Sequence, residues 1–200
     1  MRAEELLAER DHVLVAFDGP VAELPAGDGM AGRLRVMLGD AKPPRKVERT
    51  DDPYVVLAHA AAIGPATERA VHTQLCRLEA EMVAAARLAP GVLSAFARLA
   101  AAGTRITVVG GLAADPIRAF LVVHGLDEHV RRLAGRTGPD RMTPGMITAA
   151  IRELVVPLEA CAFVGSTDND IAAAREAGVD VVRYRRPSEE LPWFDAVAQV

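Results

Sequence analysis

The chain has 200 residues, of which half are hydrophobic and a quarter are charged, as is usual for a folded globular protein. Twenty-three basic and 27 acidic residues give a formal net charge of −4, and the arginines lie scattered among acids, which argues against nucleic-acid binding. No apolar run approaches the roughly 18 residues that span a bilayer, and the charged first residues lack the apolar centre of a secretion signal. We therefore expect a cytoplasmic protein with no nucleic-acid and no membrane partner.

Four short apolar runs predict buried strands, at residues 13–17, 105–109, 160–165 and 179–184. Helical patterns separate the last three runs from one another. Strands that alternate with helices need crossover connections, and these connections produce a parallel sheet. The expected fold class is therefore α/β, with a Rossmann-like parallel sheet.

Three helices follow in the second half, and local signals place their ends. Asp115 and Pro116 begin the first, which stops at Gly125, and Thr143 with Pro144 opens the second. Asp168 or Asn169 is expected to cap the third helix, which ends at Gly178.

The segment between the first two predicted strands is different, because it shows helical periodicity and no convincing strand. Helices are expected at residues 34–38, 53–63, 66–88 and 91–102. We expect residues 21–88 to form a small helical cap, with residues 1–20 and 89–200 forming the α/β core. Open parallel sheets bind ligands at the carboxyl ends of their strands, where such a cap would lie.

Four short motifs follow the predicted strands or begin the predicted helices. They are Ala16-Phe17-Asp18-Gly19, Val108-Val109-Gly110-Gly111, Arg141-Met142-Thr143-Pro144 and Gly165-Ser166-Thr167-Asp168-Asn169-Asp170. The stretch Ala173-Ala174-Arg175-Glu176-Ala177-Gly178-Val179 follows the last of them. In this order and context the motifs resemble those of the haloacid dehalogenase (HAD) superfamily of phosphatases and dehalogenases, of the type with a small helical cap. The resemblance covers nearly the whole chain.

The resemblance implies a catalytic site from which this sequence departs at the first motif. In the family that motif is D-x-D-G, where the first carboxylate attacks phosphorus and the second acts as general acid and base. Here Ala16 stands at the nucleophile position, whereas Asp18 retains the acid/base position. A methyl group can neither attack phosphorus nor ligate Mg²⁺.

The other three motifs depart in the same way. Gly110 replaces a phosphate-binding hydroxyl residue, Thr143 replaces a lysine, and Ser166 replaces the first metal-binding acid, although Asp170 remains. We therefore predict a catalytically inactive pseudo-phosphatase with a binding, regulatory or scaffold role. The alternative is an atypical HAD-family hydrolase or lyase that uses Asp18 and Asp170 without an aspartyl-phosphate intermediate. Whether the protein is an enzyme stays open.

The same positions define the expected ligand site, and its metal site should be weakened. The positions expected to line the cleft are Ala16, Gly110, Thr143 and Ser166. The residues expected to bind the ligand are Asp18, Gly19, Gly110, Gly111, Thr143 and Ser166. Asp18 and Asp170 would hold Mg²⁺ weakly or not at all, and no other cofactor is expected. Asp18 has a purely structural alternative, in which it caps its own turn. The expected partner is an unidentified small molecule or protein, and a homodimer is a further alternative.

Overall fold

The computed structural model describes residues 3–39, 42–139, 144–153, 156–186 and 192–199, without the side chains at 144–147 and 199. Its main sheet has six strands in the order β5-β4-β1-β6-β7-β8, and the first five of these are parallel. The bounds are β1 His12–Ala16, β4 Arg105–Ala113, β5 Val130–Arg136, β6 Cys161–Gly165, β7 Asp180–Tyr184 and β8 Val197–Gln199. The expected α/β class with a Rossmann-like parallel sheet is confirmed.

Two strands of this sheet were not predicted from the sequence, and both are edge strands. β5 carries Arg131 and Arg132, which interrupt any apolar run because an edge strand keeps contact with solvent. β8 is short and pairs antiparallel with β7. A third difference concerns β4, which continues beyond the predicted end at residue 109, through Gly110 and Gly111, to Ala113.

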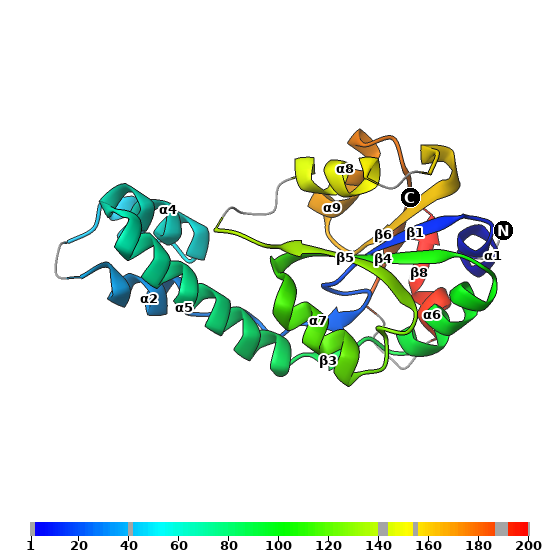
Figure 1. Cartoon of the computed structure of the whole chain (residues 1–200), viewed down its shortest axis with the longest axis horizontal. Coiled ribbons are helices and arrows are strands. Elements are labelled where there is room, and N and C mark those ends of the chain that lie inside the picture. Colours follow the sequence, from blue (N-terminus) through cyan, green and yellow to red (C-terminus); the bar gives the residue numbers. More distant parts are fainter. Residues whose placement is uncertain (1–2, 40–41, 140–143, 154–155, 187–191, 200) are drawn as a thin grey trace.

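Helices cover both faces of the sheet (Figure 1). One face packs against α1 (Ala3–Ala8), α6 (Val92–Ala101), α7 (Ala114–Val123) and the 3₁₀ turn η3 (Trp193–Ala196), and the other against α8 (Pro144–Arg152) and α9 (Asp168–Glu176). A further 3₁₀ turn, η2 (Leu158–Ala160), precedes β6. Side chains of β1 alternate between the two faces, as a strand buried on both sides requires.

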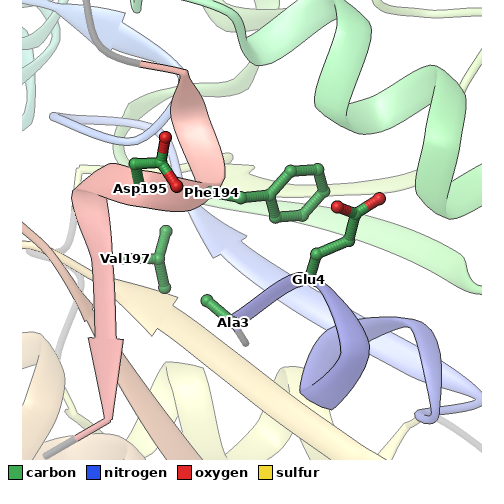
Figure 2. A pocket seen from close by; sticks show the side chains of 5 residues that line it. All are labelled: Ala3, Glu4, Phe194, Asp195 and Val197. Carbon is green, nitrogen blue, oxygen red and sulfur yellow. The ribbon is translucent and has the colours of Figure 1, made fainter. Parts of the chain in front are cut away.

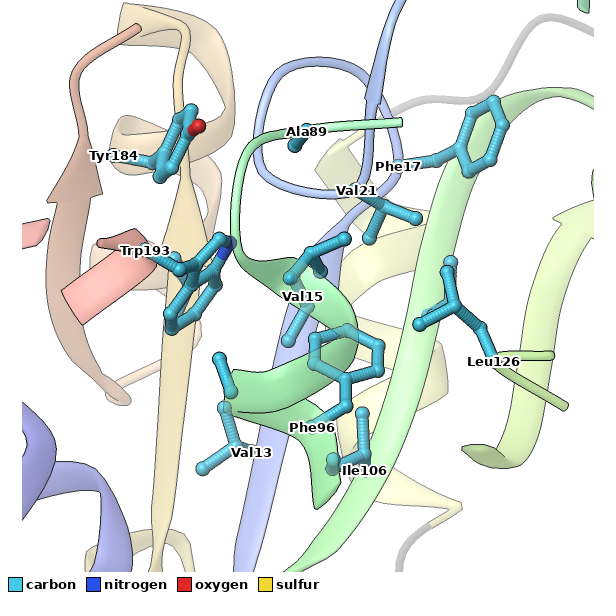
Figure 3. Close-up of a cluster of buried hydrophobic side chains, with 14 of the residues drawn as sticks. Val13, Val15, Phe17, Val21, Ala89, Phe96, Ile106, Leu126, Tyr184 and Trp193 are labelled. Atoms are coloured by element: carbon cyan, nitrogen blue, oxygen red, sulfur yellow. The ribbon is translucent and has the colours of Figure 1, made fainter. Parts of the chain in front are cut away.

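The larger hydrophobic core lies on the α6 and α7 face, where Val13 and Val15 share a cluster with Phe96 and Trp193 (Figure 3). Phe17 belongs to the same core and packs its ring edge-on against that of Phe120, with the centroids 5.3 Å apart. Trp193 is the only tryptophan of the chain, and its indole Nε1 donates to the carbonyl oxygen of Pro20 at 2.7 Å. This hydrogen bond ties the turn after β1 to the end of the chain.

The N-terminus of α9 differs from the prediction. Thr167, and not Asp168 or Asn169, is the capping residue, because its side chain accepts a hydrogen bond from the backbone N–H of Asp170. The Asp170 carboxylate accepts in return from the N–H of Thr167, which completes a capping box. Two of the helix's free N–H groups are satisfied in this way.

Residues 21–88, called the insert below, contain the helices α2 (Met30–Arg35), η1 (Val36–Leu38), α3 (Arg45–Glu48), α4 (Pro53–Ile63) and α5 (Pro65–Ala84). A short antiparallel pair, β2 (Ala22–Glu23) with β3 (Arg87–Leu88), joins its two ends and was not predicted. The insert has its own hydrophobic cluster, in which Leu34, Val56 and Leu75 are fully buried. Figure 1 shows these helices extending to one side of the sheet. None of the helices in the described part of the chain is long and apolar enough to cross a bilayer.

Shortening Leu75 should destabilise the insert, because this side chain is completely buried in the insert's own cluster. We expect Leu75→Ala to lower the free energy of unfolding by about 2–5 kcal/mol. Circular dichroism in urea measures the loss of helix, and Trp193 fluorescence reports on the larger core. The control Val123→Ala, at a side chain that is 79% exposed, should change stability by less than about 0.5 kcal/mol. An equal effect of the two substitutions would contradict a separate core in the insert.

Candidate functional site

Asp18 is the first exposed residue after the buried strand β1, and a tight turn holds it in place. The N–H of Ala22 donates to the carbonyl of Phe17 at 2.9 Å, and the N–H of Gly19 donates to the carbonyl of Ala22 at 2.8 Å. Gly19 has a φ of +95°, a backbone conformation that other residues rarely adopt. The turn therefore presents the Asp18 carboxyl at the carboxyl end of the sheet, while Ala16 stays buried below it.

Ser166 approaches this turn from the end of β6. Its Oγ donates to the backbone carbonyl of Asp18 at 2.9 Å. A Cβ atom at position 19 would lie only 2.7 Å from the same Oγ, so glycine is also required for this close approach. The Ser166 hydroxyl thus links the ends of β1 and β6 by donating its hydrogen to a main-chain oxygen.

The acids at the start of α9 are engaged in local interactions. Asp170 belongs to the capping box, and Asp168 forms an ion pair with Arg183 at 2.6 Å while remaining largely exposed. Within the described ranges, no three histidine, cysteine or acidic side chains gather in a way that could hold a metal ion. Of the two residues expected to hold Mg²⁺ weakly, Asp170 uses its carboxylate in the cap of α9.

Electrostatics set Asp18 apart from the other acids at this edge. Loss of hydration beside the packed turn raises the pKa of Asp18, and the carboxylate of Asp170 raises it further. The guanidinium of Arg186 and a hydrogen bond from the backbone of Leu24 act in the opposite direction, but the pKa remains above its ordinary value. A carboxyl with a raised pKa retains its proton to higher pH, as a general acid must.

Gly110 lies under the site and makes room for a neighbouring side chain. A Cβ atom here would be 2.5 Å from Cδ1 of Ile117 and 3.3 Å from Cβ of Phe17. The volume that a serine would need is therefore filled by Ile117 of α7. Gly111 is exposed, and its carbonyl accepts a hydrogen bond from the Tyr54 hydroxyl at 3.3 Å. Thr143 lies outside the described residues.

A model of haloacid dehalogenase-like hydrolases matches residues 31–178 of this chain. The chain belongs to that family. The phosphoglycolate phosphatase of Rhodospirillum rubrum is 30% identical over 122 residues, which are 58% of this chain and 49% of the relative. The chain thus spans about half the length of this curated relative.

Solved structures of HAD-like proteins share the fold. CbbY from Rhodobacter sphaeroides, in complex with phosphate, superimposes with a TM-score of 0.60 at 22% identity, covering 88% of this chain and 86% of that one. A predicted phosphoglycolate phosphatase from Haemophilus somnus 129pt gives 0.64 at 17% identity, covering 94% and 91%. At such identities the likeness concerns the fold alone.

The structure of this HAD-like protein also brings together charged residues that the sequence pattern did not connect. Glu23 of β2 accepts from Arg87 of β3 at 2.8 Å and from Arg186 at 2.7 Å, and these hydrogen bonds lower the pKa of Glu23. Arg186 follows β7 and also faces Asp18, so the base of the insert is linked electrostatically to the first motif. In the sequence, Arg186 stands close to Arg183 and Arg185, and this small basic cluster is the local signal for the contact.

A second group joins the insert to the ends of β4 and β5. Glu79 of α5 and Arg136 of β5 form an ion pair at 2.5 Å, with each side chain only 1% exposed. Arg136 also stacks over the ring of Tyr54, 5.7 Å from its centroid. Burial, followed by the charge of Glu79, raises the pKa of Tyr54 to about 12. The sequence pattern did not reveal this group because β5 was not predicted and because a glutamate in a helix is normally expected on its exposed side.

A pocket of about 590 Å³ lies elsewhere, between α1 and η3 (Figure 2). It is lined by Ala3, Glu4, Phe194, Asp195 and Val197. None of the motif residues lines this pocket. The Glu4 carboxylate beside it is paired with Arg98. The pocket is therefore not a candidate for the site of this HAD-like protein.

Asp18→Asn should stabilise the protein at neutral pH, because ionised Asp18 is less favourable in the folded state than in the unfolded chain. An acid with a raised folded pKa binds its proton more tightly when folded, so its contribution to stability falls as pH rises above the ordinary value of 3.8. We expect a higher melting temperature than wild type at pH 7 and no difference below pH 3.8. Asparagine keeps an oxygen that accepts from Leu24.

The control is Asp168→Asn, which removes a carboxylate from the same edge but from an exposed ion pair. Thermal unfolding across the pH range should show no gain for this variant. A gain for Asp18→Asn that is confined to acidic pH, or is absent at pH 7, would contradict the raised pKa.

Proposed function

We propose that this HAD-like protein does not transfer phosphoryl groups and instead acts as a binding, regulatory or scaffold protein, a pseudo-phosphatase. One observation carries the proposal. The motif positions Ala16, Gly110 and Ser166 offer a methyl group, a space filled by Ile117, and a hydroxyl bonded to the main chain. None of the three presents a carboxylate nucleophile, a free hydrogen-bond donor for a phosphate group or a carboxylate ligand for a metal at the carboxyl end of the sheet.

The size of the expected effect follows from the missing nucleophile. Without a carboxylate at position 16, no oxygen is available to form the covalent intermediate that divides the reaction into two easier steps. Loss of a hydrolase nucleophile typically costs roughly 10⁶-fold in kcat. The ligand of the strand-end site is proposed to be a small molecule or a protein, and the homodimer stays an alternative to be tested by the mass in solution.

A second candidate is an atypical hydrolase or lyase of the same family, and the environment of Asp18 favours it. Asp18 is exposed at the strand ends, its pKa is raised, and Asp170 lies near enough to contribute to that shift. Such a group is suited to protonate a leaving oxygen. Phosphoglycolate and other phosphorylated metabolites belong in the substrate panel because the curated relative is a phosphoglycolate phosphatase.

Phosphate release with Mg²⁺ distinguishes the two candidates. We expect no turnover by the wild type and measurable turnover by a restored variant with Ala16→Asp, Gly110→Ser, Thr143→Lys and Ser166→Asp. Ile117→Val should accompany Gly110→Ser, because Cδ1 of Ile117 occupies the space of the new side chain. Turnover by the wild type that disappears in Asp18→Asn would refute the pseudo-phosphatase and support the atypical enzyme.

The matched control for the restored variant carries Ala16→Asn instead of Ala16→Asp, together with the other substitutions. Asparagine has nearly the same shape as aspartate but lacks the nucleophilic oxygen. Activity confined to the variant with Ala16→Asp would show that the wild type lacks phosphatase activity because its nucleophile is missing. Equal activity of both variants would show that position 16 is not the nucleophile position.

A further inference from the structure

The Glu79 carboxylate receives three hydrogen bonds where the insert meets the sheet. Oε2 accepts from Nη2 of Arg136 at 2.5 Å and from the backbone N–H of Ala113 at 2.9 Å. Oε1 accepts from the Tyr54 hydroxyl at 3.3 Å, which shares its single hydrogen with the Gly111 carbonyl at the same distance. Glu79 is 1% exposed, so protein donors have replaced water around this carboxylate. Charge-assisted hydrogen bonds of this kind are the strong ones.

Two of the three donors come from the α/β core. Ala113 ends β4 and is the residue before α7, so its N–H lies at the positive end of a ten-residue helix. Arg136 ends the adjacent strand β5, and the two residues are paired in the sheet register. The core therefore aims a backbone donor and a guanidinium at one point, an arrangement that binds small oxyanions.

Arg136 is a fixed part of this arrangement. Its side chain is buried and also donates to the carbonyl of Gly138 and, at 3.0 Å, to Nε2 of His72. Its Nε is buried without a hydrogen-bond partner among the described residues. A buried guanidinium requires an anion, because burial of an unpaired charge is strongly unfavourable. In this fold that anion comes from α5, 57 residues earlier in the chain.

We propose that Glu79 is a built-in anionic ligand: its carboxylate fills a small-oxyanion site formed by Ala113 N–H, Arg136 and Tyr54 and thereby holds the insert against the core. This role does not depend on the proposed function. Once the Glu79 carboxylate is removed, the same donors are expected to bind an external carboxylate or phosphate. The Tyr54 hydroxyl, which also contacts Gly111, adds a second link from the insert to the end of β4.

Chemical rescue tests the proposal. Glu79→Ala removes the carboxylate and leaves the donors, so we expect a lower melting temperature that sodium acetate or sodium phosphate partly restores in a saturable manner. Sodium chloride at matched ionic strength should not restore it. Rescue by acetate alone indicates a site limited to a carboxylate, and rescue by phosphate as well indicates a general oxyanion site. No saturable rescue by either anion would overturn the proposal.

The matched control is the double variant Glu79→Ala with Arg136→Met, which lacks the cation of the site. It should show no rescue by either anion, and the wild type should show none because its site is filled. Equal rescue of the double variant would place the anion elsewhere and refute the assignment. Exchange of the Ala113 amide, followed by NMR, gives a local readout that general stabilisation by salt would not reproduce.

A second variant keeps the test valid where Glu79→Ala does not fold. Glu79→Gln retains the shape and an acceptor oxygen but removes the charge. We expect the Ala113 amide to exchange about tenfold faster or more in this variant, and proteolytic cleavage near β2 and β3 to accelerate as the insert detaches. Protection equal to that of the wild type would show that the negative charge is unnecessary, which overturns the role of Glu79 as an anion.

Discussion

The parallel pairing of β1 with both β4 and β6 is the constraint on which the site depends. In this register Ala16 lies opposite Val109, and Val15 lies opposite Val164. Parallel strands end at the same edge of a sheet, so the turn with Asp18, the Gly110 segment and Ser166 meet although they are far apart in sequence. If the pairing of β1 with its neighbours shifted by one residue, the side chains of Ala16 and Asp18 would point to the other face of the sheet.

At that edge, the polar side chains of Ser166 and Asp170 form hydrogen bonds with the protein's own main chain. The hydroxyl of Ser166 bonds to the carbonyl of Asp18, and the carboxylate of Asp170 completes the cap of α9. Ile117 fills the space above Gly110. Each of these residues is compatible with a well-packed structure at the ends of the strands. Among the described motif residues, Asp18 is the carboxyl that faces solvent with a raised pKa.

The contact between the insert and the core is governed by charge and only partly by apolar packing. Removing Glu79 and Arg136 from water costs free energy, which their mutual attraction and the hydrogen bonds from Ala113 and Tyr54 offset. Such a pair demands one geometry, since a displaced partner would leave a buried charge. Glu23, Arg87 and Arg186 add a more exposed group of charges at the base of the insert. Together these contacts join the insert to the core at the ends of β4 and β5 and at the β2–β3 pair.

The sequence by itself determined the α/β class, the central strands and most helices, because these depend on local periodicity and on turn and cap residues. It also predicted that Asp18 would follow a buried strand, whereas the placing of Ala16 at a nucleophile position came from the resemblance to the HAD superfamily. Only the tertiary structure decided the edge strands β5, whose two arginines interrupt any apolar pattern, and β8, which is only three residues long. It alone revealed the use of Ser166 as a main-chain donor and the pairing of Glu79 with Arg136, since contacts between distant residues arise from the packing of elements and leave no local signal.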